Sequence, residues 1–353
     1  MIKQMLKTFL FLAMFFLLPN FSQAAIIFED NFNDSPDWQS AESYPSTNAG
    51  WPNTWKDKPG GPSQPPPQNW TAYSAAIPRW DRGPTWKLDA SGARNSGKGI
   101  TFAVEAVHTW AGGGLDLYLG NVGYQELYVR GYYKYDPVTF HWPTINNEGI
   151  NNGNYHKIAR ISRYQLEPSL VNNPQQFLAP SYQAPTFYPE VAVNTGTGYQ
   201  NPPDLNAVHF LGARVFDPGA GDASAEDVYT LPMPSDGGWH SYEFRVKMNS
   251  APGVADGEWE VWVDDGVNPY QHHKRTGLAW IGADSVNGLS PGWNWVNALD
   301  NITINQTGTI YENTEMKIFL DDFVISDSFI GKDYVIGTAD ITAPAAPTGL
   351  GVT

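Results

Sequence analysis

Residues 237–266 read GGWHSYEFRVKMNSAPGVADGEWEVWVDDG and contain two runs with the period of a β-strand. Between residues 240 and 248 the even-numbered side chains are bulky and the odd-numbered ones polar or charged, so one face of the run is apolar. In the second run Trp259, Val261 and Val263 share a face in the same way. Turn-forming residues fill the interval 249–257. The stretch therefore predicts an antiparallel hairpin with one buried face.

The same alternation recurs along the rest of the chain. Its clearest instance is residues 125–136. Further strands are expected at 26–32, 99–108, 115–119, 154–163, 207–216 and 316–326. No segment has helical periodicity over three turns, and residues 34–86 and 164–204 have the composition of irregular loops. The pattern predicts an all-β fold, a two-sheet antiparallel jelly-roll sandwich with long irregular loops.

Composition divides the chain into three parts. Residues 1–24 have a basic start, an apolar run at 9–18 and small residues at 22–24, which is typical of a secretory signal peptide. Residues 25–338 form the predicted sandwich domain, and the Pro- and Ala-rich residues 339–353 predict a linker. We therefore expect a secreted protein, extracellular or periplasmic, without a membrane-spanning segment.

Charge and aromatic content narrow the range of partners. The chain has no cysteine, which excludes disulfides and cysteine catalysis. Its net charge of −15, from 36 acidic and 21 basic residues, argues against nucleic acid and anionic membranes as partners. The 14 Trp and 18 Tyr residues suit stacking on sugar rings, so we expect a polysaccharide partner; alternatively, these rings fill a wide core. We expect the protein to be monomeric.

Four segments, in their order along the chain, resemble one group of proteins. They are ELYVRGYYKYD (126–136), NYHKIARI (154–161), the hairpin at 237–266 and KIFLDDFVISDSFIG (317–331). Over about residues 26–333 the chain is similar to the concanavalin A-like jelly rolls of secreted polysaccharide lyases and glycan-binding modules. The resemblance implies a concave sheet that carries a glycan on its outer face. The tail ITAPAAPTGLGVT (341–353) resembles the opening of a fibronectin type III domain.

The resemblance also implies where the site lies. Residues 125–136 become the concave-face strand, with alternate side chains on the open face. Within 154–163, His156 and Arg160 share parity and are expected to point the same way. The predicted catalytic groove consists of Arg130, Tyr132, His156 and Arg160. Expected substrate-binding residues are Tyr128, Lys134 and His209.

Three functions remain open at this stage. The first is a secreted carbohydrate-recognising protein that binds a polysaccharide on its concave sheet face. The second is a polysaccharide lyase that cleaves a uronate-containing glycan by β-elimination, where Arg neutralises the carboxylate and Tyr or His transfers protons. The third is a non-catalytic cell-surface interaction domain. A Glu-x-Asp-x-x-Glu motif is absent from the sequence, which argues against a retaining glucanase.

Two acidic pairs are candidates for a structural metal site. Glu29 and Asp30 fall in the first predicted strand, and Asp321 and Asp322 in the last. The terminal strands of a jelly roll often lie side by side, and carboxylate oxygens would then suit Ca²⁺. The alternative is that these acids face solvent at strand ends.

Overall fold

The computed structural model describes fourteen segments of the chain, and the structural statements below concern these alone. They are residues 25–40, 66–75, 86–105, 113–120, 123–136, 155–163, 186–192, 210–215, 229–230, 237–264, 271–281, 292–299, 302–303 and 315–337. The predicted signal peptide and the predicted linker lie outside them.

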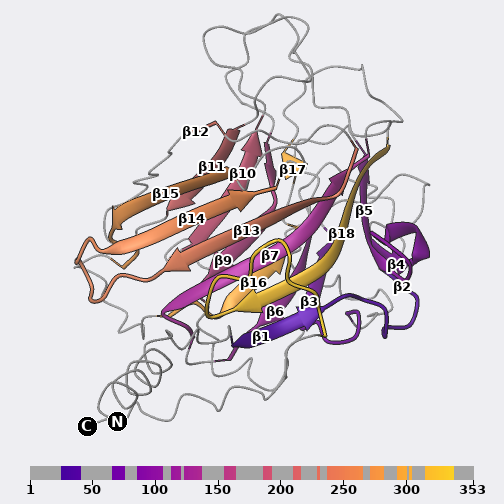
Figure 1. Ribbon diagram of the computed structural model, residues 1–353, viewed down its shortest axis with the longest axis horizontal. Helices are drawn as coiled ribbons and strands as arrows, with labels where there is room; N and C mark the ends of the chain where they lie inside the picture. Colours follow the sequence, from indigo (N-terminus) through magenta and orange to yellow (C-terminus); the bar gives the residue numbers. More distant parts are fainter. Residues whose placement is uncertain are drawn as a thin grey trace, which may run out of the picture.

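Sheet A contains the hairpin that the sequence predicts, near one of its edges (Figure 1). Eight of its strands follow one another in space: β15 (Gln271–Leu278), β14 (Gly257–Val263), β13 (His240–Lys247), β7 (Glu126–Tyr135), β18 (Glu315–Ser326), β5 (Gly99–Glu105), β4 (Trp86–Asp89) and β2 (Trp38–Gln39). The ninth strand, β1 (Ile26–Asp30), pairs with β18. The first and last of the described strands thus lie side by side, as expected.

Sheet B lies against sheet A and is also antiparallel. Seven strands follow in the order β12 (Tyr229–Thr230), β11 (Phe210–Val215), β10 (Thr186–Ala192), β9 (Ala159–Ser162), β16 (Trp295–Ala298), β6 (Gly113–Tyr118) and β3 (Ala72–Ala75). Strand β8 (Tyr155–Lys157) pairs with β10 and with β17 (Ile302–Thr303). The chain is therefore a two-sheet, antiparallel jelly-roll sandwich.

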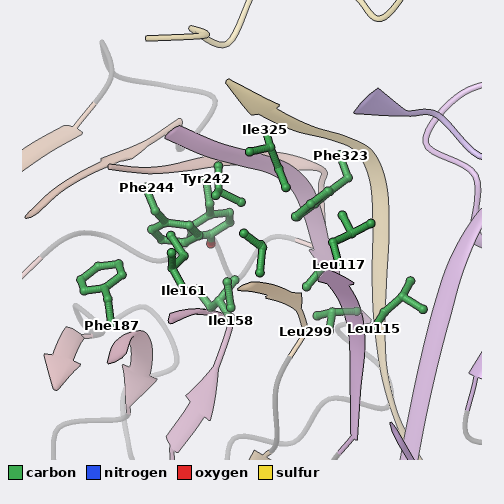
Figure 2. Packing of buried hydrophobic residues seen from close by; sticks show 14 of the residues in the cluster. Leu115, Leu117, Ile158, Ile161, Phe187, Tyr242, Phe244, Leu299, Phe323 and Ile325 are labelled. Carbon is green, nitrogen blue, oxygen red and sulfur yellow. The ribbon is translucent and has the colours of Figure 1, made fainter. Parts of the chain in front are cut away.

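The core fills the space between the two sheets. On β13 the predicted buried face is correct, since Tyr242, Phe244 and Val246 are all in the core. In Figure 2, Phe244 of sheet A lies above Phe187 and Ile161 of sheet B. This interlayer packing buries apolar surface, worth about 25 cal/mol per Å², and it orients the alternate residues of every strand away from the core.

Helices contribute almost nothing to the described residues. Their single helical element is a 3-10 turn, Ala90–Gly92, that Asp89 caps by accepting a hydrogen bond from the backbone N–H of Ser91. Among the described residues, no helix is long and apolar enough to cross a membrane.

The predicted strand at 154–163 is interrupted. Phe187 of β10 pairs with Ile161, whereas Glu190 pairs with Lys157. Two residues of β10 therefore face three residues of the neighbouring chain, which is a β-bulge at Ile158. Because a bulge shifts the alternation by one residue, the shared parity of His156 and Arg160 no longer implies a shared face. A common direction of the two side chains stays a prediction.

Strand β10 lies inside the predicted irregular loop 164–204. It contains Pro189, which has no backbone N–H to donate and is normally confined to strand edges or bulges. Pro189 pairs with Ala213 on one side and falls opposite the bulge on the other. The bulge therefore accommodates a proline inside the sheet, and the long predicted loop contains a strand.

Candidate functional site

The face of sheet B turned away from the core carries a group of polar and aromatic side chains. Strands β6, β9 and β16 each place two residues in the core, and their neighbours alternate onto the other face. We call these neighbours the outer-face cluster: Asp116, Tyr118, Arg160, Ser162, Trp295 and Asn297. Strand register arranges them in two rows, Asp116–Asn297–Arg160 and Tyr118–Trp295–Ser162. Residues directly opposite one another across strands lie within contact distance.

Asp116 holds two of its neighbours in place. Its Oδ1 atom accepts a hydrogen bond of 2.8 Å from the Asn297 side-chain amide and one of 3.1 Å from the Trp295 indole N–H. The Trp295 ring in turn lies 6.1 Å from the Tyr118 ring, centroid to centroid, at 45°. One carboxylate therefore fixes the orientation of an amide and of an aromatic pair.

All residues of the cluster except the half-buried Tyr118 are buried, although they face away from the core. Asn297 is 3% exposed and Ser162 has no exposed surface. Neither the Asn297 Oδ1 atom nor the Ser162 Oγ atom has a hydrogen-bond partner. Buried polar atoms in proteins are almost always paired, so two orphans on one face of a sheet call for a partner such as a ligand or water.

Tyr118 and Arg163 lie close enough to influence each other electrostatically. Burial raises the pKa of the Tyr118 phenol, and the positive charge of Arg163 partly opposes this rise. Burial also lowers the pKa of Arg163, whose guanidinium donates to the Gly292 carbonyl at 3.4 Å. At neutral pH Tyr118 therefore keeps its proton, which suits a hydrogen-bond donor or a general acid better than a base.

Sequence reasoning placed Arg130 and Tyr132 on an open face, and this was wrong. Both lie on β7 in sheet A, beneath residues 327–337, which we call the C-terminal strap. Arg130 has no exposed surface and donates to the carbonyls of Gly331 (2.7 Å) and Tyr334 (3.0 Å). The Tyr132 hydroxyl donates to the Lys332 carbonyl at 2.5 Å. Because hydrogen bonds to the strap backbone engage both side chains, Arg130 and Tyr132 serve to hold the strap and do not line the predicted groove.

The four predicted catalytic residues are also divided between the sheets. Arg160 belongs to β9 in sheet B and is a member of the outer-face cluster. His156 lies on β8 of the same sheet, where its backbone pairs with Val191 and Ile302. The core separates these two from Arg130 and Tyr132, so a single groove containing all four does not form. The expected substrate residue His209 lies outside the described residues.

The other expected substrate residues belong to sheet A. The Tyr128 hydroxyl donates to Glu126 at 2.9 Å, and burial raises the pKa of this phenol. Lys134 places its ammonium 4.9 Å from the Phe319 ring centroid. Neither residue is near the outer-face cluster, because sheet B lies on the other side of the core.

The predicted calcium ligands are already engaged by protein donors. Asp30 is buried and accepts from the Phe32 N–H (2.6 Å) and the Trp70 indole (3.0 Å), and burial raises its pKa to about 6. Glu29 accepts from the Tyr334 hydroxyl at 2.6 Å.

The second acidic pair is engaged by Arg94. Its backbone N–H donates to Asp321 at 2.7 Å, and its guanidinium Nε donates to Asp322 at 2.9 Å. A guanidinium at this position competes with a metal cation. Among the described residues no three His, Asp or Glu side chains could together hold a metal ion. Calcium stays a prediction from the sequence, which a calcium titration of the melting temperature tests.

Five of the six cluster residues were missed from the sequence. Alternation in LDLYL (115–119) does place Asp116 and Tyr118 on one face. That pattern does not reveal which strand lies beside residues 115–119, because the β6–β16 pairing joins residues about 180 positions apart. Trp295 and Asn297 lie in a stretch whose alternation is short, so their place beside Asp116 follows only from the register.

No family model matches the chain, and neither does any curated protein. Among solved structures, a marine alginate lyase from Aplysia kurodai is 12% identical with a TM-score of 0.42, covering 69% of this chain and 87% of that one. An endo-β-1,4-glucuronan lyase from the fungus Trichoderma reesei is 13% identical with a TM-score of 0.42, covering 74% and 93%.

A third similar structure is described as a pseudo β-1,3-glucanase and immunostimulatory antigen of Mycobacterium tuberculosis. It is 13% identical with a TM-score of 0.39, covering 86% of this chain and all of that one. Identities and TM-scores as low as these support no conclusion about the activity of this chain. The predicted resemblance to a fibronectin type III domain falls on residues 341–353, outside the described residues.

Proposed function

We propose that the protein binds a polysaccharide on the outer face of sheet B. The observation that carries this proposal is the outer-face cluster, where a carboxylate, an amide, a hydroxyl, a guanidinium and two aromatic rings lie in two adjoining rows. Sugars present hydroxyl groups around an apolar ring face, and such a mixed surface complements them. The buried orphan oxygens of Ser162 and Asn297 supply hydrogen-bonding capacity that no described protein group uses.

An acidic sugar fits the charge of this site. Arg160 lies in the cluster, and Arg163 acts electrostatically on Tyr118 of the cluster, so two positive charges are available to this site in a protein whose net charge is −15. A guanidinium binds a carboxylate with two parallel hydrogen bonds, which favours a uronate over a neutral sugar. The proposal is therefore binding of a uronate-containing polysaccharide.

A second candidate function is cleavage of that polymer by β-elimination. Tyr118 favours it, because a half-buried phenol on the outer face that keeps its proton at neutral pH can protonate a leaving oxygen. Elimination also needs a base that removes the proton next to the uronate carboxyl group. His156 on β8 is the sequence-based candidate for that base. Cleavage would produce unsaturated sugars, which absorb ultraviolet light.

One set of variants tests both functions. Binding of alginate, β-1,4-glucuronan and polygalacturonate is measured for the parent protein, Arg160→Ala and Lys332→Ala, together with ultraviolet absorbance. We expect Arg160→Ala to weaken binding of the preferred polymer about 10- to 100-fold, as expected for a lost charged hydrogen bond. Lys332→Ala removes the same charge from the C-terminal strap on the other side of the sandwich and should bind normally. Melting temperatures identify any variant that does not fold.

The results separate the candidates. Binding without an ultraviolet signal supports recognition alone, and binding with a signal that Tyr118→Phe abolishes supports the lyase. If the parent protein binds none of the three polymers, the proposal is wrong.

A further inference from the structure

The orientation of the Asn297 amide is fixed by chemistry. The Trp295 indole N–H can only donate, so the Asp116 Oδ1 atom is an acceptor. The Asn297 group 2.8 Å from this same atom must be its NH₂ group, because its oxygen would be repelled. The Asn297 oxygen is thereby directed away from Asp116, and it is the atom without a partner.

Ser162 presents a second orphan atom in the neighbouring row. Asn297 pairs with Arg160 and Trp295 pairs with Ser162, so Asn297 and Ser162 are diagonal neighbours across β16 and β9. Diagonal neighbours lie about 7–8 Å apart at their Cα atoms, within reach of one sugar ring. Both side chains are more than nine-tenths buried.

The Asn297 and Ser162 oxygen atoms require a different ligand group from the one that Arg160 binds. An amide oxygen accepts hydrogen bonds and repels a carboxylate, so Asn297 is unsuited to neutralising a uronate. That task falls to a guanidinium, and Arg160 is the direct neighbour of Asn297 in the same row. A ligand hydroxyl group is the donor that the Asn297 oxygen lacks, and the Ser162 hydroxyl can donate to or accept from another.

We propose that Asn297, held by Asp116, reads a ring hydroxyl of the bound uronate through its side-chain oxygen, and that Ser162 reads a second hydroxyl. This inference rests on the proposed polysaccharide binding and adds to it which groups determine the choice of sugar. Arg160 selects for the acid, whereas Asn297 and Ser162 select for the position and orientation of the hydroxyls. Uronates that differ at a single carbon atom are thereby distinguished.

The test couples each side chain to one ligand hydroxyl. Probes are trisaccharides of glucuronate, mannuronate, guluronate and galacturonate, each with matched forms in which one ring hydroxyl is replaced by hydrogen. We expect the parent protein to bind one deoxy form about five- to tenfold more weakly than its parent sugar, the cost of an unpaired buried acceptor. Asn297→Ala should bind that deoxy form and its parent sugar equally. Ser162→Ala should lose discrimination at a different hydroxyl.

Asn294→Ala is the matched control. Asn294 lies three residues before Asn297 and is equally buried, but its amide donates to the Gly120 carbonyl at 3.0 Å. This variant should lower the melting temperature and keep the full discrimination between sugars. A purely structural role for Asn297 would give the same result, so an Asn297→Ala protein that still discriminates overturns the inference. Equal weakening toward every probe also overturns it.

The two levels of the proposal fail differently. If the parent protein binds no uronate trisaccharide, the proposed function itself is wrong. If it binds one and prefers no hydroxyl pattern, the function stands and the roles of Asn297 and Ser162 do not.

Discussion

Two carboxyl groups on the outer face of sheet A lie where a charge is poorly solvated. Glu243 has no exposed surface and Asp321 is 5% exposed. Burial raises the pKa of each to about 7, against the hydrogen bonds that the backbone donates to them. The positive charges of Arg130 and Arg94 oppose this rise without cancelling it. Each acid therefore takes up a proton as the pH falls through about 7.

Their titration sets a pH dependence of stability. An acid whose pKa is higher in the folded state binds protons more tightly there, so it lowers stability as pH rises from its unfolded pKa through its folded one. For Glu243 the rise from 4.5 to about 7 corresponds to roughly 3 kcal/mol, and Asp321 acts in the same direction. We expect the free energy of unfolding to fall between about pH 5 and pH 8.

Urea unfolding at several pH values measures this slope. Glu243→Gln and Asp321→Asn should each flatten it, whatever their effect on stability at one pH, since neither amide titrates. Asn294→Ala, which removes no titrating group, should leave the slope unchanged. Stability that increases from pH 5 to pH 8 in the parent protein would contradict the assignment.

At the residue scale, the sequence predicts which face of a strand a side chain occupies better than it predicts which residues that side chain contacts. Alternation correctly assigns Arg130 and Tyr132 to the face of β7 turned away from the core. It carries no information about a segment 200 residues later that covers that face. The same limit hides Asp116, whose partners come from β16. A strand pattern specifies which face a residue occupies, and tertiary pairing decides what it meets there.

The C-terminal strap is held by side chains of sheet A. Glu243 accepts from the backbone N–H groups of Ile330 (2.7 Å) and Gly331 (2.8 Å), while Arg130 donates to strap carbonyls from the neighbouring strand. Register places Glu243 directly opposite Arg130. An acceptor and a donor of opposite charge thus bind the backbone of the strap together.

We expect this pair to be strongly coupled. Arg130→Met leaves the Glu243 carboxyl without its cation, so the loss in the free energy of unfolding should grow as the pH rises above about 7, toward about 3–5 kcal/mol where the carboxyl is ionised. Adding Glu243→Gln should restore part of that loss, because the double variant no longer buries a lone charge. Urea unfolding of both single variants and the double variant gives the coupling energy. Simple additivity would show that the two side chains hold the strap independently.

At the element scale, the long alternating strands are predictable and the interrupted ones are not. Strands β7, β13, β14 and β18 match their expected ranges within a few residues, because two opposed faces impose a strict period of two. The strand expected at 154–163 contains a bulge, and β10 contains a proline that faces it. The bulge and the proline each argue against a strand when taken alone, but a sheet accommodates them when they lie opposite each other. Local pattern cannot detect such compensation between segments.

The whole molecule presents two chemically different outer faces. On sheet A the C-terminal strap covers the buried charges of Arg130 and Glu243, while on sheet B the outer-face cluster keeps two orphan oxygens. The sequence predicts the sandwich and the basic strands but not which sheet each strand joins, because that depends on long-range register. Because this register could not be predicted, the sequence-based prediction wrongly assigned residues of all the basic strands to a single groove.

Net charge and local charge act in opposite senses on an acidic ligand. The net charge of −15 repels a polyuronate at long range, whereas Arg160 and Arg163 attract it only over the last few ångströms. At about 10 mM salt the screening length is roughly 30 Å and the whole protein is felt, but at about 100 mM it is roughly 10 Å. We therefore expect the association rate constant for immobilised β-1,4-glucuronan to rise several-fold between these salt concentrations, while dissociation also quickens.

An uncharged β-glucan serves as the control, and its association rate should not change. An association rate that instead falls as salt is added would mean that the arginines dominate at long range, and that the acidic surface lies away from the path of the ligand.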